Sequence, residues 1–244
     1  MDKLLSIIIP AFNEENRLPK TLGRLLDFLN ENKIDFEIIV VNDGSRDDTA
    51  GAVRDFSAED PRIKLISHFP NHGRGASVRE GVLAAVGSLI LETDSDGSVA
   101  DEAILRFIHY FNDHKDVDMI FGSRELPDSE IAYSQPFFRV FLGYGFIYLS
   151  KFLLWSWNTT DFTLGFKMFR SDAAKDIFSH QYDDHYVAEA EIVYVGRLRG
   201  WVGRELAVHW TDNRDSRVHP VRDSIRSFNG ILKLLYRRIK GLYR

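Results

Sequence analysis

Two carboxylates, Asp94 and Asp96, stand one residue apart directly after an apolar run that includes Leu91. Alternate residues of an extended strand project to the same side, so a strand that ends here can aim both carboxylates at one point. Paired oxygen ligands of this kind suit Mg²⁺ or Mn²⁺ bound together with a diphosphate. The alternative is a simple turn, because Asp, Ser and Gly favour turns for backbone reasons alone. The elements and loops around the pair decide between these two interpretations.

Short β-rich runs and helical patterns alternate through the first part of the chain. Strands are predicted over 4–9, 36–41, 63–67 and 88–92, and helices over 17–30, 48–57 and 76–86. The first of these helices has leucines at helical spacing on one face, at Leu18, Leu22, Leu25 and Leu29. Repeated β-α units with short connections predict an α/β fold in which helices cover both faces of a mostly parallel sheet.

Ligands bind such sheets beyond the carboxyl ends of the strands. Four loops are expected at that edge, over 10–15, 42–47, 70–75 and 93–98. The first loop offers an aromatic ring and acidic groups, at Pro10, Phe12 and Glu14. In the second, Asp43 can accept a hydrogen bond from a base or ribose. The third places Gly73 and Arg74 at the start of a helix, where free N–H groups and the helix dipole favour an anion, although Gly73 can also serve only as a turn.

Composition limits the class of protein. A chain of 244 residues can bury one substantial core, and we expect one domain with a tail. The absence of cysteine excludes disulfides, zinc ribbons and thiol catalysis. The third loop is neither a Walker-type phosphate loop nor a dinucleotide fingerprint, which counts against kinases and dehydrogenases. The apolar run at the N-terminus is too short for a signal peptide, so secretion is not expected, and no nucleic-acid partner is expected.

The C-terminal segment is basic within an acidic protein. From Arg217 onward it has eight Lys or Arg against one acidic residue, a net charge of +7, while the whole chain has −5. An apolar stripe of helical period runs beside these charges, at Ile225, Phe228, Leu232, Leu235, Ile239 and Leu242. This pattern predicts a basic amphipathic helix over 221–244 that lies on an anionic membrane surface. The alternative is a helix packed on its own domain with a solvated basic face.

Five motifs follow one another in a fixed order within the first 124 residues: I-I-I-P-A-F-N-E-E, I-V-V-N-D-G-S-R-D-D-T, N-H-G-R-G-A, E-T-D-S-D-G and F-G-S-R. In this order they resemble the inverting family-2 glycosyltransferases, which have the GT-A fold. Later segments at 161–170, 188–200 and 215–218 resemble the branch that transfers a sugar to dolichyl or polyprenyl phosphate, and the dolichyl-phosphate glucosyltransferases most of all. The resemblance covers about residues 4–220, which we take as the catalytic domain within 1–220.

Three positions depart from the family pattern. Asn42 stands where members usually have Asp, and Ser95 stands where Ala is usual between the two aspartates. Neither change removes the second aspartate or the proposed metal pair. Glu189 stands where this branch often has Asp, which keeps the charge but lengthens the side chain.

The resemblance implies roles for individual residues. Asp96, helped by Asp94, is expected to hold Mg²⁺ or Mn²⁺ on the diphosphate, with Ser95 beside the nucleotide sugar. Cationic contacts to donor or acceptor phosphate are expected from Arg74, Arg124, Lys167 and Arg217. Catalytic or orienting roles are expected for Asp96, Asp161, Glu189 and Glu191. For Glu189 and Glu191, the alternative is a solvated helix face.

The chemical nature of the acceptor decides whether a base is needed. A lipid phosphate is largely ionised near pH 7, because its second pKa is about 6, and its own oxygen can attack. A sugar hydroxyl would instead need a general base within hydrogen-bond reach. For such an acceptor, the acidic side chains of Asp161, Glu189 and Glu191 are the candidate bases.

The segment over 137–157 is apolar for about the length of a membrane span. It is interrupted by Arg139 and by Lys151, and a charge at mid-membrane costs about 2.5 to 3.5 kcal/mol on insertion scales. Site motifs lie on both sides of it, and one active site cannot be divided by a bilayer. We therefore predict interfacial helices and a protein held peripherally on the cytoplasmic face of a membrane. A buried core or oligomer helix is the alternative.

These observations favour transfer of a hexose to polyprenyl phosphate, with UDP-glucose as the favoured donor and GDP-mannose as a possible one. A second hypothesis keeps the fold but makes a growing glycan the acceptor. A third makes the protein a nucleotide-sugar sensor or membrane scaffold, against which the metal pair argues. A sugar nucleotidyltransferase is disfavoured because no glycine-rich loop follows the first strand. The sequence does not specify the sugar or the oligomeric state.

Overall fold

The computed structural model describes residues 4–131, 159–185, 187–211 and 220–243. The segment over 137–157, the motif over 215–218 and Arg217 within it lie outside the described residues, so the predictions for them stay predictions.

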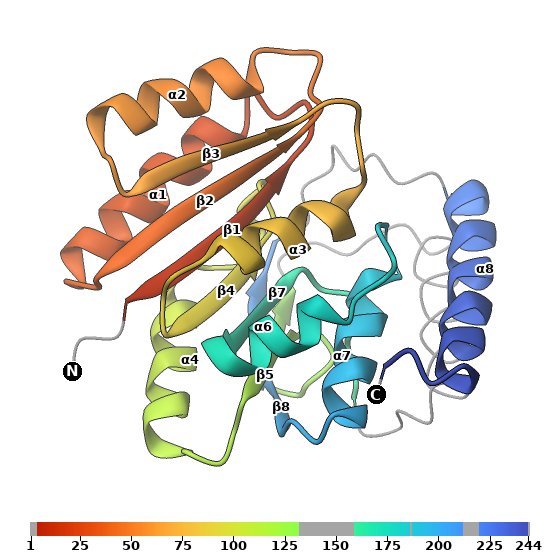
Figure 1. Cartoon of the computed structure of the whole chain (residues 1–244). Helices are drawn as coiled ribbons and strands as arrows, with labels where there is room; N and C mark the ends of the chain where they lie inside the picture. Colours follow the sequence, from red (N-terminus) through yellow and green to blue (C-terminus); the bar gives the residue numbers. More distant parts are fainter. Residues whose placement is uncertain (1–3, 132–158, 186, 212–219, 244) are drawn as a thin grey trace.

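The first half of the chain follows the predicted alternation of strands and helices (Figure 1). Its elements are β1 (Leu5–Ala11), α1 (Leu18–Glu31), β2 (Phe36–Asp43), α2 (Thr49–Glu59), β3 (Ile63–His68), α3 (Arg74–Ala84) and β4 (Leu89–Thr93). The ends of each predicted element lie within two residues of the observed ends. The predicted elements are therefore confirmed.

The second half completes the sheet and adds the C-terminal helix. Its elements are α4 (Glu102–Asp113), β5 (Met119–Ser123), β6 (Glu130–Ile131), β7 (Phe166–Arg170), α6 (Ser171–Ser179), α7 (Ala188–Leu198), β8 (Gly203–Ala207), β9 (His209–Trp210) and α8 (Pro220–Ile239). The seven-stranded sheet has the order β3-β2-β1-β4-β7-β5-β8. Strand β7 runs antiparallel to both neighbours, β4 and β5, and the other pairs in this sheet are parallel. The prediction of a mostly parallel sheet is confirmed.

The strands are apolar on both faces because helices cover both faces. In β1, Ile7 and Ile9 join the core that packs against α1, α2 and α4, while Ile8 joins the core that packs against α3, α6 and α7. This alternation follows from the period of two in an extended strand. Leu18, Leu22, Leu25 and Leu29, the predicted apolar face of α1, are all buried in the first core.

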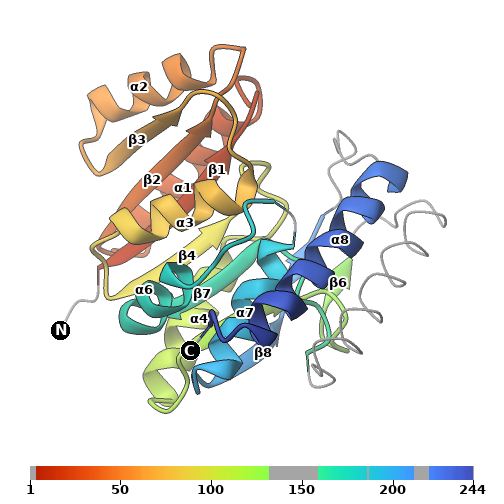
Figure 2. The same ribbon diagram turned by 45° about the vertical axis from the view of Figure 1, so that its right-hand side comes forward.

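Helix α8 lies beside α7 and contributes to the second core (Figure 2). Ile231 and Leu234 are buried there, whereas Phe228, Leu232 and Ile239 are 44%, 46% and 82% exposed. The stripe predicted from the sequence is therefore largely not the packing face of α8. Among the described residues, no helix is both long and apolar enough to cross a membrane.

Leu22→Ala tests the first core. Leu22 is fully buried, so we expect the free energy of unfolding to fall by about 3 to 5 kcal/mol through lost burial and the cavity left behind. Leu83→Ala is the matched control, because Leu83 is a helical leucine that is 45% exposed, and it should change stability by less than about 1 kcal/mol. Urea titrations of both variants measure the difference, and equal losses would contradict the assigned core.

Candidate active site

The predicted loops meet at one edge of the sheet. Strand β1 pairs in parallel with β2 on one side and with β4 on the other, and Ala11 lies opposite Asn42. The loops that follow these strands therefore leave the sheet in the same direction, where Figure 1 shows their arrowheads. The sequence Asp94 to Asp96 follows directly after β4, so the paired carboxylates lie at this edge.

Asp43 joins the second loop to the third. Its carboxylate accepts hydrogen bonds from the backbone N–H groups of His72 (2.7 Å) and Gly73 (2.9 Å) and from the side-chain amide of Asn71 (2.7 Å). Gly73 has a φ of +106°, and a Cβ there would lie 2.2 Å from the carbonyl oxygen of Asp184. Only glycine fits this turn without strain. The structure thus shows Asp43 organising the glycine turn, and its contact with a nucleotide stays a prediction.

Arg74 contacts acidic groups from two other elements. At the first position of α3, it donates from Nε (3.1 Å) and Nη2 (2.8 Å) to Oδ1 of Asp94, and it forms an ion pair with Glu189 on α7. Gly165 packs against this group, since a Cβ at Gly165 would lie 2.7 Å from the Asp94 carboxylate. The predicted residues Arg74, Asp94 and Glu189 are therefore neighbours in space, held by opposite charge.

A second cationic side chain, that of Lys167, contacts the same glutamate as Arg74. Lys167 on β7 is fully buried, donates to the carbonyl oxygen of Leu164 (2.5 Å) and forms an ion pair with Glu189. The nearest oxygen of Glu92 on β4 lies 3.4 Å from Lys167 Nζ. In the described structure Lys167 neutralises interior carboxylates, and its role as a phosphate contact stays a prediction.

Glu92 and Glu189 are both buried, but their pKa values shift in opposite directions because their neighbouring charges differ. Burial, together with the negative charge of Glu189, raises the pKa of Glu92 to about 8. Burial would also raise the pKa of Glu189, but Arg74 and Lys167 outweigh it and hold that pKa below its usual value. Glu189 and Glu191 are 7% and 0% exposed, so the alternative of a solvated helix face is wrong for both.

The chemistry of Asp94 and Asp96 suits a divalent cation. Oδ1 of Asp96 accepts from the backbone N–H of Ser98 (3.0 Å), and burial, followed by the charge of Asp94, raises the pKa of Asp96. A divalent cation would relieve this repulsion between two nearby carboxylates. Within the described part of the chain, no three His, Cys, Asp or Glu residues form a metal cluster. Asp94 and Asp96 are the residues that would hold such a cation, which would supply positive charge beside a diphosphate.

Asp161 and Arg124 form a buried pair. Arg124 follows β5 and donates from Nε (2.7 Å) and Nη2 (3.1 Å) to the two carboxylate oxygens of Asp161, which is fully buried. Thr163 donates a further bond from its hydroxyl (2.9 Å). Burial would raise the pKa of Asp161, but Arg124 and Thr163 outweigh it and lower that pKa. A fully buried carboxylate with a lowered pKa is poorly suited to act as a general base near neutral pH.

The first-loop residues differ in exposure. Pro10 is buried within β1, and Phe12 is 37% exposed at the end of that strand. Glu14 is buried and forms an ion pair with Arg17 (2.6 Å). Ser95 is also buried, and its carbonyl oxygen accepts from the hydroxyl of Thr21 (2.9 Å). Phe12 is thus partly exposed, Glu14 and Ser95 are buried against the protein, and contacts of these residues with a nucleotide stay predictions.

Glu92 and Gly165 belong to the site but are not among the residues predicted from the sequence. The signal for Glu92 was a carboxylate inside the apolar run L-I-L-E-T, which is an unusual place for an acid unless a cation faces it. Gly165 lies close to the side chains of Arg74 and Asp94, a contact between segments about 70 to 90 residues apart in the chain. No local pattern indicates such a contact.

The fold and this site define a nucleotide-sugar glycosyltransferase with a GT-A fold. Residues 6–178 match the family described as "Glycosyl transferase family 2", and the chain belongs to that family. A dolichyl-phosphate beta-glucosyltransferase of Dictyostelium discoideum is 32% identical over 250 residues, covering 98% of this chain and 76% of that protein. The human dolichyl-phosphate beta-glucosyltransferase is 28% identical over 253 residues, covering 99% of this chain and 78% of that protein.

Solved structures with the same fold include two synthases. Mannosyl-3-phosphoglycerate synthase from Rubrobacter xylanophilus has a TM-score of 0.69 at 13% identity, covering 98% of this chain and 75% of that one. Glucosyl-3-phosphoglycerate synthase from Mycobacterium tuberculosis, in complex with Mn²⁺ and UDP-glucose, has a TM-score of 0.67 at 13% identity, covering 96% and 79%. At these identities the likeness is one of fold, and the predicted GT-A fold is confirmed.

Arg124→Met tests the buried pair. Loss of the guanidinium leaves the carboxylate of Asp161 buried without its cation, so we expect the free energy of unfolding to fall by about 3 to 5 kcal/mol. The matched control is Arg62→Met, because Arg62 is 40% exposed in its pair with Asp60 and should contribute about 1 kcal/mol or less. Chemical denaturation at pH 7 measures both, and a loss at Arg124 no larger than that at Arg62 would contradict the pairing.

Proposed function

We propose that this enzyme transfers glucose from UDP-glucose to a polyprenyl or dolichyl phosphate with inversion. One observation supports this acceptor over a glycan hydroxyl: the three acidic side chains considered as bases are each already engaged. Arg124 pairs with Asp161, Arg74 and Lys167 pair with Glu189, and Glu191 accepts hydrogen bonds from Tyr182 and Asp183. A phosphate acceptor needs no base, since its ionised oxygen is itself the nucleophile. The names of the similar relatives agree with this choice.

The proposed step is a single displacement at the anomeric carbon. An oxygen of the acceptor phosphate forms the new bond to that carbon, while the bond to the diphosphate breaks and UDP leaves with the electron pair. No proton transfer is needed. Negative charge grows on the leaving diphosphate, and the cationic side chain of Arg74 at the start of α3 would offset it.

We propose that Asp96 and Asp94 hold Mg²⁺ or Mn²⁺ at this position. When bound, the cation would supply positive charge to the leaving group. Asp94 already faces the guanidinium of Arg74, so a cation held by Asp94 and Asp96 would share that carboxylate with Arg74. The Mn²⁺ and UDP-glucose named for the M. tuberculosis structure support this assignment by analogy of fold.

Asp96→Asn should lower the rate of sugar-lipid formation by about 10²-fold or more, since one charge that holds the cation is lost. The matched control is Asp55→Asn, because Asp55 is an exposed aspartate on α2, and it should keep full activity. The assay follows organic-extractable labelled sugar with Mn²⁺, polyprenyl phosphate and UDP-glucose. Thermal unfolding of both variants checks that each is folded, and full activity of Asp96→Asn would contradict the proposed metal site.

The donor and acceptor are tested by parallel incubations of the wild-type protein. UDP-glucose, UDP-galactose, UDP-N-acetylglucosamine and GDP-mannose are each offered with polyprenyl phosphate, and we expect a mild-acid-labile sugar lipid with UDP-glucose. The glycan alternative would be supported by transfer to a free oligosaccharide without any lipid product. That result would refute the proposed acceptor.

We also propose that α8 lies on the cytoplasmic surface of an anionic membrane. Phe228, Leu232 and Ile239 leave apolar surface exposed on this helix, and Lys233, Arg238 and Lys240 are exposed beside them. Apolar side chains flanked by cations are typical of interfacial helices. Because α8 also contributes Ile231 and Leu234 to the core, deleting it would disturb the fold, and point substitutions give the cleaner test.

Leu232→Glu combined with Ile239→Glu should weaken binding to phosphatidylcholine vesicles containing phosphatidylglycerol by about tenfold or more, because apolar contact is lost and negative charge is added. The matched control is Leu83→Glu with Val86→Glu, two exposed apolar residues at the end of α3. Vesicle co-sedimentation measures both variants. Equal binding of the two would count against α8 as the membrane contact.

A further inference from the structure

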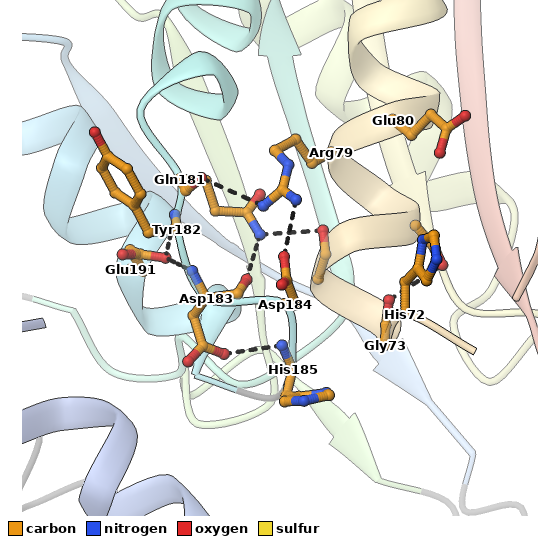
Figure 3. A network of polar contacts seen from close by, with 12 residues as sticks. His72, Gly73, Arg79, Glu80, Gln181, Tyr182, Asp183, Asp184, His185 and Glu191 are labelled. Atoms are coloured by element: carbon orange, nitrogen blue, oxygen red, sulfur yellow. Dashed lines mark hydrogen bonds and ion pairs between the residues drawn. The ribbon is translucent and has the colours of Figure 1, made fainter. Parts of the chain in front are cut away.

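The buried carboxylate of Glu191 joins the C-terminal end of the chain to a loop over 181–185. Oε2 of Glu191 accepts from the backbone N–H groups of Tyr182 (3.0 Å) and Asp183 (2.6 Å), as Figure 3 shows. Oε1 accepts from the hydroxyl of Tyr243 and lies 3.3 Å from Nη1 of Arg237. Glu191 is fully buried, so these donors stand in for the water that the carboxylate has lost.

The same loop packs against the start of α3. Gln181 donates from its side chain to the carbonyl oxygen of Gly75 (3.0 Å), and Arg79 donates to the carboxylate of Asp184 (2.8 Å) (Figure 3). The carbonyl oxygen of Asp184 accepts from the backbone N–H of Ala76 (3.3 Å). The close approach of this oxygen to Gly73 is what leaves no room for a Cβ there. The loop therefore supports the glycine turn that precedes Arg74.

Tyr243 is held in place from several sides. Its side chain is 3% exposed, and its ring packs edge-on against Tyr182, with 5.7 Å between ring centroids. Arg199 donates to its carbonyl oxygen (3.3 Å), and the hydroxyl of Tyr182 donates to that of Leu242 (3.4 Å). The last turn of the chain after α8 is thus fixed on α7 and on the 181–185 loop.

We propose that Tyr243 is a positioning residue for the nucleotide-sugar site and acts through Glu191 and the 181–185 loop on the turn at Gly73. This proposal rests on the proposed function in one respect: it takes a nucleotide sugar to be the ligand that binds at the Gly73 turn. Removing the hydroxyl takes one donor from a buried carboxylate, which then holds the backbone of Tyr182 and Asp183 less firmly. The loop can then move away from the start of α3, and the donor site loses part of its support.

The test compares Tyr243→Phe with Tyr110→Phe in the full chain. Tyr110 lies on α4 and packs against the first core, so the control removes a hydroxyl on the other face of the sheet. Hydrogen exchange of the ligand-free protein should show the amides of Tyr182 and Asp183 exchanging about tenfold faster in Tyr243→Phe and unchanged in the control. Unchanged exchange at both amides would overturn the proposal, whether or not UDP binds.

Kinetics and binding supply the second measurement. We expect the Kd for UDP with Mn²⁺, and the KM for UDP-glucose, to rise about fivefold to tenfold in Tyr243→Phe, with the KM for polyprenyl phosphate unchanged. A merely structural role would lower the melting temperature and the active fraction while leaving the donor KM unchanged, and that pattern would refute the proposal. Combining Tyr243→Phe with Glu191→Gln should give less than the sum of the two effects, because both act on one contact. Additive effects would mean that Tyr243 does not act through Glu191, which would refute the proposal.

Discussion

Charge balance at the carboxyl edge of the sheet is the constraint on which the site depends. Arg74 and Lys167 face three carboxylates, Asp94, Glu189 and Glu92, in surroundings where an unpaired charge is costly. Burial and the charge of Glu189 raise the pKa of Glu92 to about 8, so Glu92 adds less negative charge to this group than an exposed glutamate would. The balance links β4, β7, α3 and α7, which gives the edge a defined arrangement before any ligand binds.

In this arrangement the acidic side chains form ion pairs with basic side chains. They are therefore not placed to accept a proton from a substrate. Glu189 fixes Arg74 next to Asp94, and Asp161 fixes Arg124 at the end of β5. Such a site is suited to anionic ligands, because arginine and lysine side chains bind phosphates. A hydroxyl acceptor would need one of these carboxylates to give up its partner. The ion pairs therefore stabilise the fold and also favour an acceptor that needs no base.

The sequence predicted the β-α units and the position of the Asp94 and Asp96 pair well, because strands with period two and the leucine face of α1 are local patterns. The burial of Glu189 and Glu191 could not be read in that way, since acidic residues in the first turn of a helix are also typical of solvent-exposed helices. The place of Lys167 depends on β7 inserting antiparallel between β4 and β5. Long-range pairing of this kind has no signature in the residues of the strand itself.

The amphipathic pattern of helix α8 is compatible with packing on the domain and with an exposed apolar and basic surface. One side buries Ile231 and Leu234 in the core, and a neighbouring side leaves Leu232 and Ile239 exposed beside basic residues. The helix therefore packs on its own domain and also leaves apolar and basic side chains exposed. Tyr243 lies four residues after the end of α8 and contacts Glu191, so the C-terminal segment is held on α7 by its last residues as well as by Ile231 and Leu234.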